Sequence, residues 1–152
     1  MATRDPDDIR GWQRLSDTVS TSGRLLADDL PRLAASGVRH VINLALDDHP
    51  EALADEAALL ARQGIGYTHI PVPFDAPTNA HYEAFVTALE HASGEPVHVH
   101  CIANYRVSAF FYRLHIERGM EAGEARALMQ RQWDPLGSDD PRAAPWRALI
   151  SP

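Results

Sequence analysis

Val97-His98-Val99-His100-Cys101-Ile102-Ala103-Asn104-Tyr105-Arg106 is the part of this sequence that says most about its architecture. It places the only cysteine of the chain between a β-branched run and the start of a helix. A loop that leaves a strand and opens a helix turns its backbone N–H groups toward a common point, where they can hold an anion. We therefore expect residues 101–106 to form an anion-binding loop at the end of a strand.

The surroundings of Cys101 favour the charged form of its thiol. Amides at a helix start and the guanidinium of Arg106 both stabilise a thiolate, and such surroundings lower a thiol pKa from about 8.5 to roughly 3.5–7.5. Arg106 also offers a planar fork for two oxygens of an anion. Ser108 could donate its hydroxyl to the sulfur, and Asn104 suits a tight bend because asparagine tolerates a positive φ. The pattern predicts a nucleophile in an oxyanion pocket.

Strand and helix patterns alternate along the rest of the chain. The predicted strands are residues 38–46, 67–72 and 97–100, with a weak edge strand at 18–21. The predicted helices are residues 28–36, 51–63, 78–94, 107–119 and 122–133, and the Pro-rich residues 134–152 are expected to wrap the surface. This alternation predicts an α/β fold with a mainly parallel central sheet flanked by helices, and with ligands at the carboxyl ends of the strands.

Length and charge limit the classes of protein to which the chain can belong. Its 152 residues, 45% of them apolar, suit a single domain over residues 1–152. Fourteen basic against 21 acidic residues give a net charge of −7, which argues against nucleic acid as a partner. The first eight residues lack the apolar core of a signal peptide, and no later run is long enough for a bilayer. We expect a cytoplasmic protein with no membrane partner.

Asp75 is the candidate general acid. It lies in the loop that follows the strand at 67–72, and therefore at the same end of the sheet as Cys101. In the competing interpretation Asp75 is a turn or capping residue of the helix that begins near Thr78.

Structural interpretations compete with the functional ones at the other candidate positions as well. Cys101 could be a buried strand-end thiol, and Arg106 could only pair with a carboxylate. We expect His100 to fix local backbone and to point away from the pocket, and Tyr105 to form its rim or to pack. His98 shares a strand face with His100, but the cysteine alternates to the other face, so we expect no metal.

Four segments carry a family resemblance. They are Ser20-Thr21-Ser22-Gly23, Val41-Ile42-Asn43-Leu44, Phe74-Asp75-Ala76-Pro77-Thr78 and residues 100–108. With the predicted order of elements, they resemble the cysteine-dependent tyrosine and dual-specificity phosphatases, whose fold is called phosphotyrosine protein phosphatase II-like. Within that superfamily the chain is similar to a bacterial family described as β-lactamase-hydrolase-like or as a domain of unknown function. The resemblance covers about residues 15–130.

The resemblance implies a mechanism through phosphocysteine. Cys101 would attack phosphorus, Arg106 and the loop amides would hold the oxygens, and Asp75 would protonate the leaving group. The phosphate-binding residues implied are Ile102, Ala103, Asn104, Tyr105 and Arg106, with His100 and Ser108 in support. The expected partner is a phosphorylated small molecule or phosphoprotein, with phosphate, sulfate or vanadate as pocket anions. Neither a cofactor nor a metal is implied.

The loop departs from the phosphatase pattern by one residue. That pattern has five residues between cysteine and arginine, whereas four separate Cys101 from Arg106. One lost oxyanion donor commonly costs ~10²–10³ in rate. The shorter spacing also resembles rhodanese-like sulfurtransferases, which would carry a persulfide on Cys101 and would not need Asp75. A third interpretation is a non-catalytic module that binds an anion or a phosphopeptide.

Overall fold

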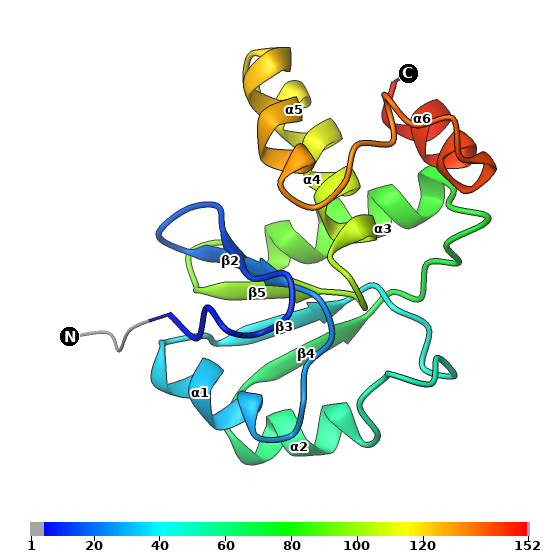
Figure 1. Ribbon diagram of the computed structural model, residues 1–152. Coiled ribbons are helices and arrows are strands. Elements are labelled where there is room, and N and C mark those ends of the chain that lie inside the picture. The colour runs from blue at the N-terminus through cyan, green and yellow to red at the C-terminus, as the bar shows by residue number, and fades with distance from the viewer. Residues whose placement is uncertain (1–4, 152) are drawn as a thin grey trace.

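A five-stranded sheet forms the centre of the computed structural model, which describes residues 5–151 (Figure 1). The strands run in the spatial order β1-β2-β5-β3-β4. They are β1 (Gln13–Arg14), β2 (Val19–Ser22), β3 (His40–Asn43), β4 (Gly66–His69) and β5 (Val97–His100). Only β1 is antiparallel to its neighbour; the other pairs are parallel. The predicted α/β class with a mainly parallel sheet is confirmed.

Helices cover both faces of this sheet, as Figure 1 shows. One side carries α1 (Asp29–Ala35) and α2 (Glu56–Arg62). The other carries α3 (Asn79–His91), α4 (Tyr105–Glu117), α5 (Ala122–Gln130) and α6 (Ala144–Ile150). Neighbouring residues of β3 show that both faces are buried: Val41 packs in the cluster with α1 and α2, and Ile42 in the other. Both side chains are fully buried, as expected of a strand that is covered on both faces.

The predictions for the two ends of the chain need correction. The segment predicted as a weak edge strand is β2, which lies inside the sheet between β1 and β5. The edge is β1, whose two residues are too few to show an alternating pattern. The tail does not simply wrap the surface, because it forms α6 and buries Trp146 completely in the core. A proline at the start of a helix is preorganised for that position, and Pro145 occupies it.

Most other boundaries moved by a few residues without changing the type of element, and α4 begins two residues before the predicted start at 107. The strand predicted at 38–46 is paired only over His40–Asn43, and the helix predicted at 51–63 begins at Glu56. The expectation for the first eight residues falls partly on residues 1–4, which lie outside the described part of the chain, as does residue 152. Among residues 5–151, none of the helices has the length and apolar character needed to cross a bilayer.

The register of the strands aligns the carboxyl ends of β2, β5 and β3. Ser22 of β2 and Asn43 of β3 both lie opposite His100, the last residue of β5. The residues that follow these three positions therefore meet at one end of the sheet. Parallel α/β sheets place their ligands there.

Candidate active site

Cys101 lies at the carboxyl end of β5, the central strand of the sheet. Its backbone N–H donates to Ser22 O at 3.3 Å, so the residue continues the pairing with β2. The side chain is 1% exposed and borders the larger apolar cluster. The thiol is therefore at the inner end of the loop, where the backbone of residues 102–104 leaves the sheet and enters α4.

The sharp turn of the loop is made by Asn104. Its φ of 66° lies in the left-handed region, as expected for the asparagine at this bend. The buried side chain donates to Gly11 O at 2.7 Å and to Thr21 Oγ1 at 3.1 Å. Two distant segments thus hold the turn that starts α4, and the helix begins at Tyr105 without a side-chain cap.

A second backbone segment packs closely against the loop. The N–H of Arg24 donates to Ile102 O at 2.9 Å, and Gly23 precedes it. A methyl group at Gly23 would lie 2.5 Å from Ile102 O and 3.2 Å from Ala103 Cα. No side chain fits at that distance, so glycine is required here by the close approach of two backbones.

Arg106 is the second residue of α4, in the first turn after the loop. It is 8% exposed, and its Nη1 is buried without a hydrogen-bond partner in residues 5–151. Its Cζ lies 5.7 Å from the centre of the Phe74 ring. Burial lowers the pKa of Arg106, and the charge of Cys101 acts in the opposite direction. The guanidinium is thus a buried hydrogen-bond donor whose charged form a negative charge on Cys101 would stabilise.

His100 connects the cysteine to α2 on the other side of the sheet. Its Nε2 lies 2.7 Å from Glu56 Oε2, and its Nδ1 lies 3.2 Å from Cys101 O. Both Glu56 and His100 are buried, with 5% and 4% of their side chains exposed. Sequence reasoning missed Glu56, because its helix was expected to start five residues earlier and nothing local marks it as a partner of residue 100.

The other histidine of β5 is part of a separate polar group. His98 Nδ1 lies 2.8 Å from Ser20 Oγ, and its Nε2 lies 2.8 Å from Ser22 Oγ. Its ring stacks on Trp12 at 5.2 Å. Burial lowers the pKa of His98 well below 6.5, and the neighbouring His100 lowers it further. Both ring nitrogens are engaged, and within the described residues no three His, Cys, Asp or Glu side chains gather as a metal site.

Asp75 lies in an exposed turn directly after Phe74, whose ring contacts Arg106. Thr78 caps α3, accepting from the N–H of His81, and His81 Nδ1 accepts from the N–H of Thr78. The capping position is therefore filled by Thr78, and the Asp75 carboxylate has no hydrogen bond within residues 5–151. Because Phe74 directly precedes Asp75 and its ring contacts Arg106, the turn that carries Asp75 lies near Arg106.

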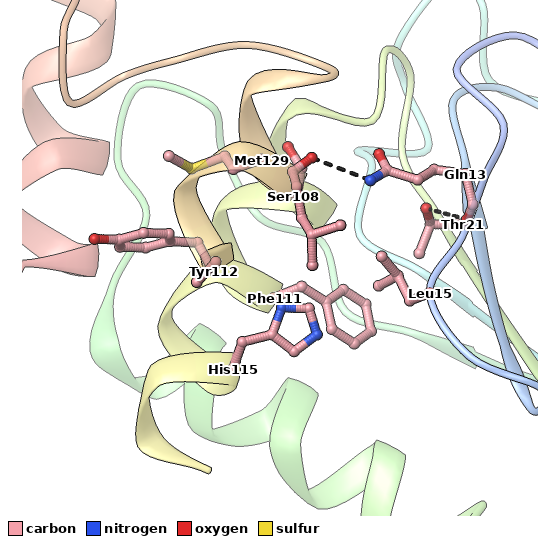
Figure 2. A pocket seen from close by; sticks show the side chains of 10 residues that line it. Gln13, Leu15, Thr21, Ser108, Phe111, Tyr112, His115 and Met129 are labelled. Carbon is pink, nitrogen blue, oxygen red and sulfur yellow. Dashed lines mark hydrogen bonds between the residues drawn. The ribbon is translucent and has the colours of Figure 1, made fainter. Parts of the chain in front are cut away.

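Ser108 faces the interior of the helical layer. Its hydroxyl donates to Tyr105 O at 3.2 Å. Figure 2 shows it among the residues around a small cavity between α4, α5 and β1–β2, together with Gln13 and Met129. This cavity has a volume of about 10 Å³, room for about one water molecule. The described contact of Ser108 therefore stabilises the start of α4 rather than reaching the sulfur.

An aromatic rim stands beside the loop. Tyr105 stacks on Trp133 with ring centres 4.8 Å apart and an interplanar angle of 2°, and Trp133 Nε1 donates to Tyr105 O at 2.9 Å. The pocket next to them has a volume of about 180 Å³. We call it the aromatic pocket; its walls include Phe74, Tyr105, Trp133, Ser138, Asp140 and Arg142. Sequence reasoning placed Tyr105 at a rim but missed Trp133, which read as the end of a helix.

This geometry, a buried cysteine and arginine on a strand-to-helix loop of a parallel sheet, fits the class of cysteine-dependent phosphatases. The family described as "Tc-R-P: Polymorphic toxin system, DSP-PTPase phosphatase" matches residues 18–107, more than half of the chain. The chain belongs to this DSP-PTPase phosphatase family, within the tyrosine and dual-specificity phosphatase superfamily, as the resemblance predicted.

Solved structures of similar proteins agree with this family assignment. A Shewanella putrefaciens CN-32 protein described as "Putative phosphatase (DUF442)" is 30% identical, with a TM-score of 0.82 over 95% of this chain and 89% of that chain. P. aeruginosa TpbA is 21% identical and shares the fold, with a TM-score of 0.70 over 99% of this chain and 95% of that chain.

A curated relative is considerably longer than this chain. The "Beta-lactamase hydrolase-like protein" of Xylella fastidiosa (strain Temecula1) is 29% identical over 136 residues, which are 87% of this chain. The chain spans 30% of the length of that relative.

Proposed function

We propose that this chain is a single phosphatase-like domain that hydrolyses phosphate monoesters through a phosphocysteine on Cys101. The observation that carries the proposal is the buried Nη1 of Arg106, which has no hydrogen-bond partner in the described residues and lies in the first turn of the helix that follows the Cys101 loop. A buried donor without an acceptor costs free energy, which a bound ligand can recover. Two oxygens of a phosphoryl group match a guanidinium fork.

Each of the three candidate catalytic residues has one role in this reaction. The thiolate of Cys101 attacks phosphorus, and the ester P–O bond breaks as Asp75 gives its proton to the leaving oxygen. A water then attacks phosphorus with Asp75 accepting its proton, the S–P bond breaks, and phosphate leaves with the thiolate regenerated. Arg106 and the amides of residues 102–106 stabilise the charge that develops on the phosphoryl oxygens.

The short loop supports this chemistry because of where it turns. Asn104 takes the left-handed conformation, so α4 begins at Tyr105 and the side chain of Arg106 leaves the first turn of the helix. Arg106 is thereby buried in the first turn of α4 although only four residues separate it from Cys101. We propose that the loop turns over phosphate esters, at a rate reduced by up to ~10²–10³ if one oxyanion donor is missing.

The proposed ligand is a phosphorylated small molecule or phosphoprotein. TpbA, which shares this fold, has been crystallised with phosphotyrosine. The net charge of −7 means that such an anion is captured by the local donors of the loop rather than by the field of the whole chain. The proposal places the enzyme in the cytoplasm, where an unpaired thiol stays reduced.

A sulfurtransferase is the second candidate, and the four-residue spacing between Cys101 and Arg106 favours it. In that reaction the thiolate attacks the outer sulfur of thiosulfate, the S–S bond breaks, and a persulfide and sulfite are formed. No leaving oxygen needs a proton, so Asp75 has no part in it.

The experiment is phosphate release from 4-nitrophenyl phosphate by the parent and three variants. We expect Cys101→Ser to lose at least ~10³-fold, Asp75→Asn ~10²–10⁴-fold and Arg106→Lys ~10²–10³-fold. Vanadate should inhibit the parent. Asp17→Asn is the matched control, because Asp17 is exposed and precedes β2 at the opposite end of the sheet.

Three results would count against the proposal. Phosphate release that persists in Cys101→Ser would exclude Cys101 as the nucleophile. Persulfide formation from thiosulfate that is unchanged by Asp75→Asn, without phosphate release, identifies the sulfurtransferase. Binding of vanadate or phosphate without turnover identifies a non-catalytic module.

A further inference from the structure

The aromatic pocket contains flat surfaces that no other part of the candidate site provides. The Trp133 ring lies parallel to Tyr105 at 4.8 Å and is tilted by 41° against Phe74 at 5.5 Å. Tyr105 is 38% exposed, so an outer part of this stack is accessible. These flat aromatic faces favour a ligand with a planar ring, because such a ring can stack on them.

Polar groups stand around these rings. The guanidinium of Arg142 makes a two-pronged contact with Asp140, with Nη2 to Oδ2 at 2.8 Å and Nε to both carboxylate oxygens at 3.3 Å. The two side chains are 76% and 41% exposed, so their pairing contributes little stability and can be shared with a ligand. Ser138 adds a hydroxyl at the same pocket. A plain benzene ring would use none of these donors and acceptors, whereas a heteroaromatic ring has edge groups that match them.

The pocket lies to one side of the phosphate-binding loop. Phe74 belongs to both sites: its ring approaches the Arg106 guanidinium at 5.7 Å, and it also lines the pocket. Arg106 itself does not line the pocket. A nucleotide has a sugar between its phosphate and its base, so it can place the phosphate at Arg106 and the base beyond Phe74 in the pocket, whereas a phosphorylated phenol has no such spacer.

The outer wall comes from a part of the chain that the family match does not include. The match ends at residue 107, whereas Trp133, Asp140 and Arg142 follow α5. The family match thus includes the Cys101 loop, whereas the residues of this wall lie beyond it.

We propose that the aromatic pocket binds the base of a nucleoside monophosphate whose phosphate lies on the Cys101 loop. The inference rests on the proposed function, since it assumes that this loop binds phosphate. Stacking of a base on an aromatic side chain is worth about 1–3 kcal/mol, or roughly 5- to 150-fold in affinity. The edge of the base exchanges hydrogen bonds with Asp140 and Arg142.

The test measures binding by calorimetry to the non-hydrolysing Cys101→Ser variant. The probes are inorganic phosphate, ribose 5-phosphate, phenyl phosphate and adenosine 5′-monophosphate. We expect the adenosine nucleotide to bind at least ~10-fold more tightly than ribose 5-phosphate. When Trp133→Ala is added to the Cys101→Ser variant, the affinity advantage of the nucleotide over ribose 5-phosphate should disappear. Trp133→Phe should retain most of that advantage. Thermal unfolding of each variant shows whether it is folded.

The probes separate failure of this inference from failure of the proposed function. If neither inorganic phosphate nor any ester binds, and the parent releases no phosphate, the proposed function fails and this inference with it. If phosphate and ribose 5-phosphate bind, but adenosine 5′-monophosphate binds no more tightly than ribose 5-phosphate, only this inference is overturned. It is also overturned if phenyl phosphate gains as much as the nucleotide, since the pocket then takes a plain ring directly.

Discussion

The Cys101 loop and the C-terminal segment of residues 131–151 border the same pocket but are held in different ways. Buried contacts from distant segments fix the loop: Asn104 bonds to Gly11 and Thr21, and Gly23 packs on Ile102. The C-terminal segment is held by the apolar side chains of Ala143, Trp146 and Ile150, while its Asp140 and Arg142 form an exposed ion pair at the pocket. The loop therefore has little freedom to vary, whereas the outer wall can change without loss of the fold.

The anchor of the C-terminal segment should show the largest effect on stability. Trp146 is fully buried, packs on Phe110 and donates its Nε1–H to Phe74 O at 2.7 Å. Trp146→Ala should lower the free energy of unfolding by about 3–5 kcal/mol, as measured by urea denaturation. Arg142→Ala, an exposed change in the same segment, should lower it by less than about 1 kcal/mol. Similar losses of stability in the two variants would show that Trp146 does not anchor the segment.

Gly23 tests how closely the loop is held. Gly23→Ala forces a methyl group to 2.5 Å from Ile102 O, and a backbone atom cannot rotate away. We expect a loss of about 3 kcal/mol in stability together with a lower rate of phosphate release. Gly123→Ala in α5 is the matched control, because its methyl group meets only the movable Glu121 carboxylate and alanine favours a helix. An unaltered rate in Gly23→Ala would show that the loop tolerates displacement.

Glu56 tests whether the loop depends on the far side of the sheet. Glu56→Ala leaves His100 Nε2 buried without its partner, which should cost about 2 kcal/mol. Because His100 also contacts Cys101 O, the alkylation rate of the thiol should change as well. Glu56→Gln keeps a hydrogen-bonding group at this place and should have the smaller effect on both. Equal losses in the two variants would mean that the charge, not the hydrogen bond, matters.

Acid should weaken the protein through His98. The pKa of His98 is lowered in the folded chain, so below about pH 6.5 the unfolded chain binds a proton that the folded chain does not. The free energy of unfolding should then fall as pH decreases from 6.5, by up to about 1.4 kcal/mol per pH unit. His40 and His115, whose pKa values burial also lowers, act in the same direction. Urea titrations at pH 7.5, 6.5 and 5.5 measure this slope, and His98→Gln should reduce it.

The order of elements and the cysteine loop were predictable because both depend on local patterns. Alternating strands and helices defined the class of sheet, and Asn104 was recognised as a bend residue from its tolerance of positive φ. The partners of the loop were not predictable. Glu56 and Gly11 lie 44 and 93 residues from the groups they contact, and no pattern in one sequence marks such pairs.

The tail shows the opposite failure. A stretch rich in proline read as a surface wrap, yet Trp146 within it fills the core. Composition describes a segment on average, whereas a single large apolar side chain determines whether that segment is anchored. The role of Trp133 was missed for a different reason, since its Nε1 contact with Tyr105 O joins residues 28 apart in sequence.

The depth of the single thiol has a consequence for oxidative stress. Cys101 is 1% exposed and is the only cysteine in the chain. Peroxide is small enough to approach such a sulfur, and it would convert a thiolate to a sulfenic acid. Because the chain has no second cysteine, reduction of the sulfenic acid depends on a separate reductant, and further oxidation to the sulfinic acid would permanently remove the proposed nucleophile.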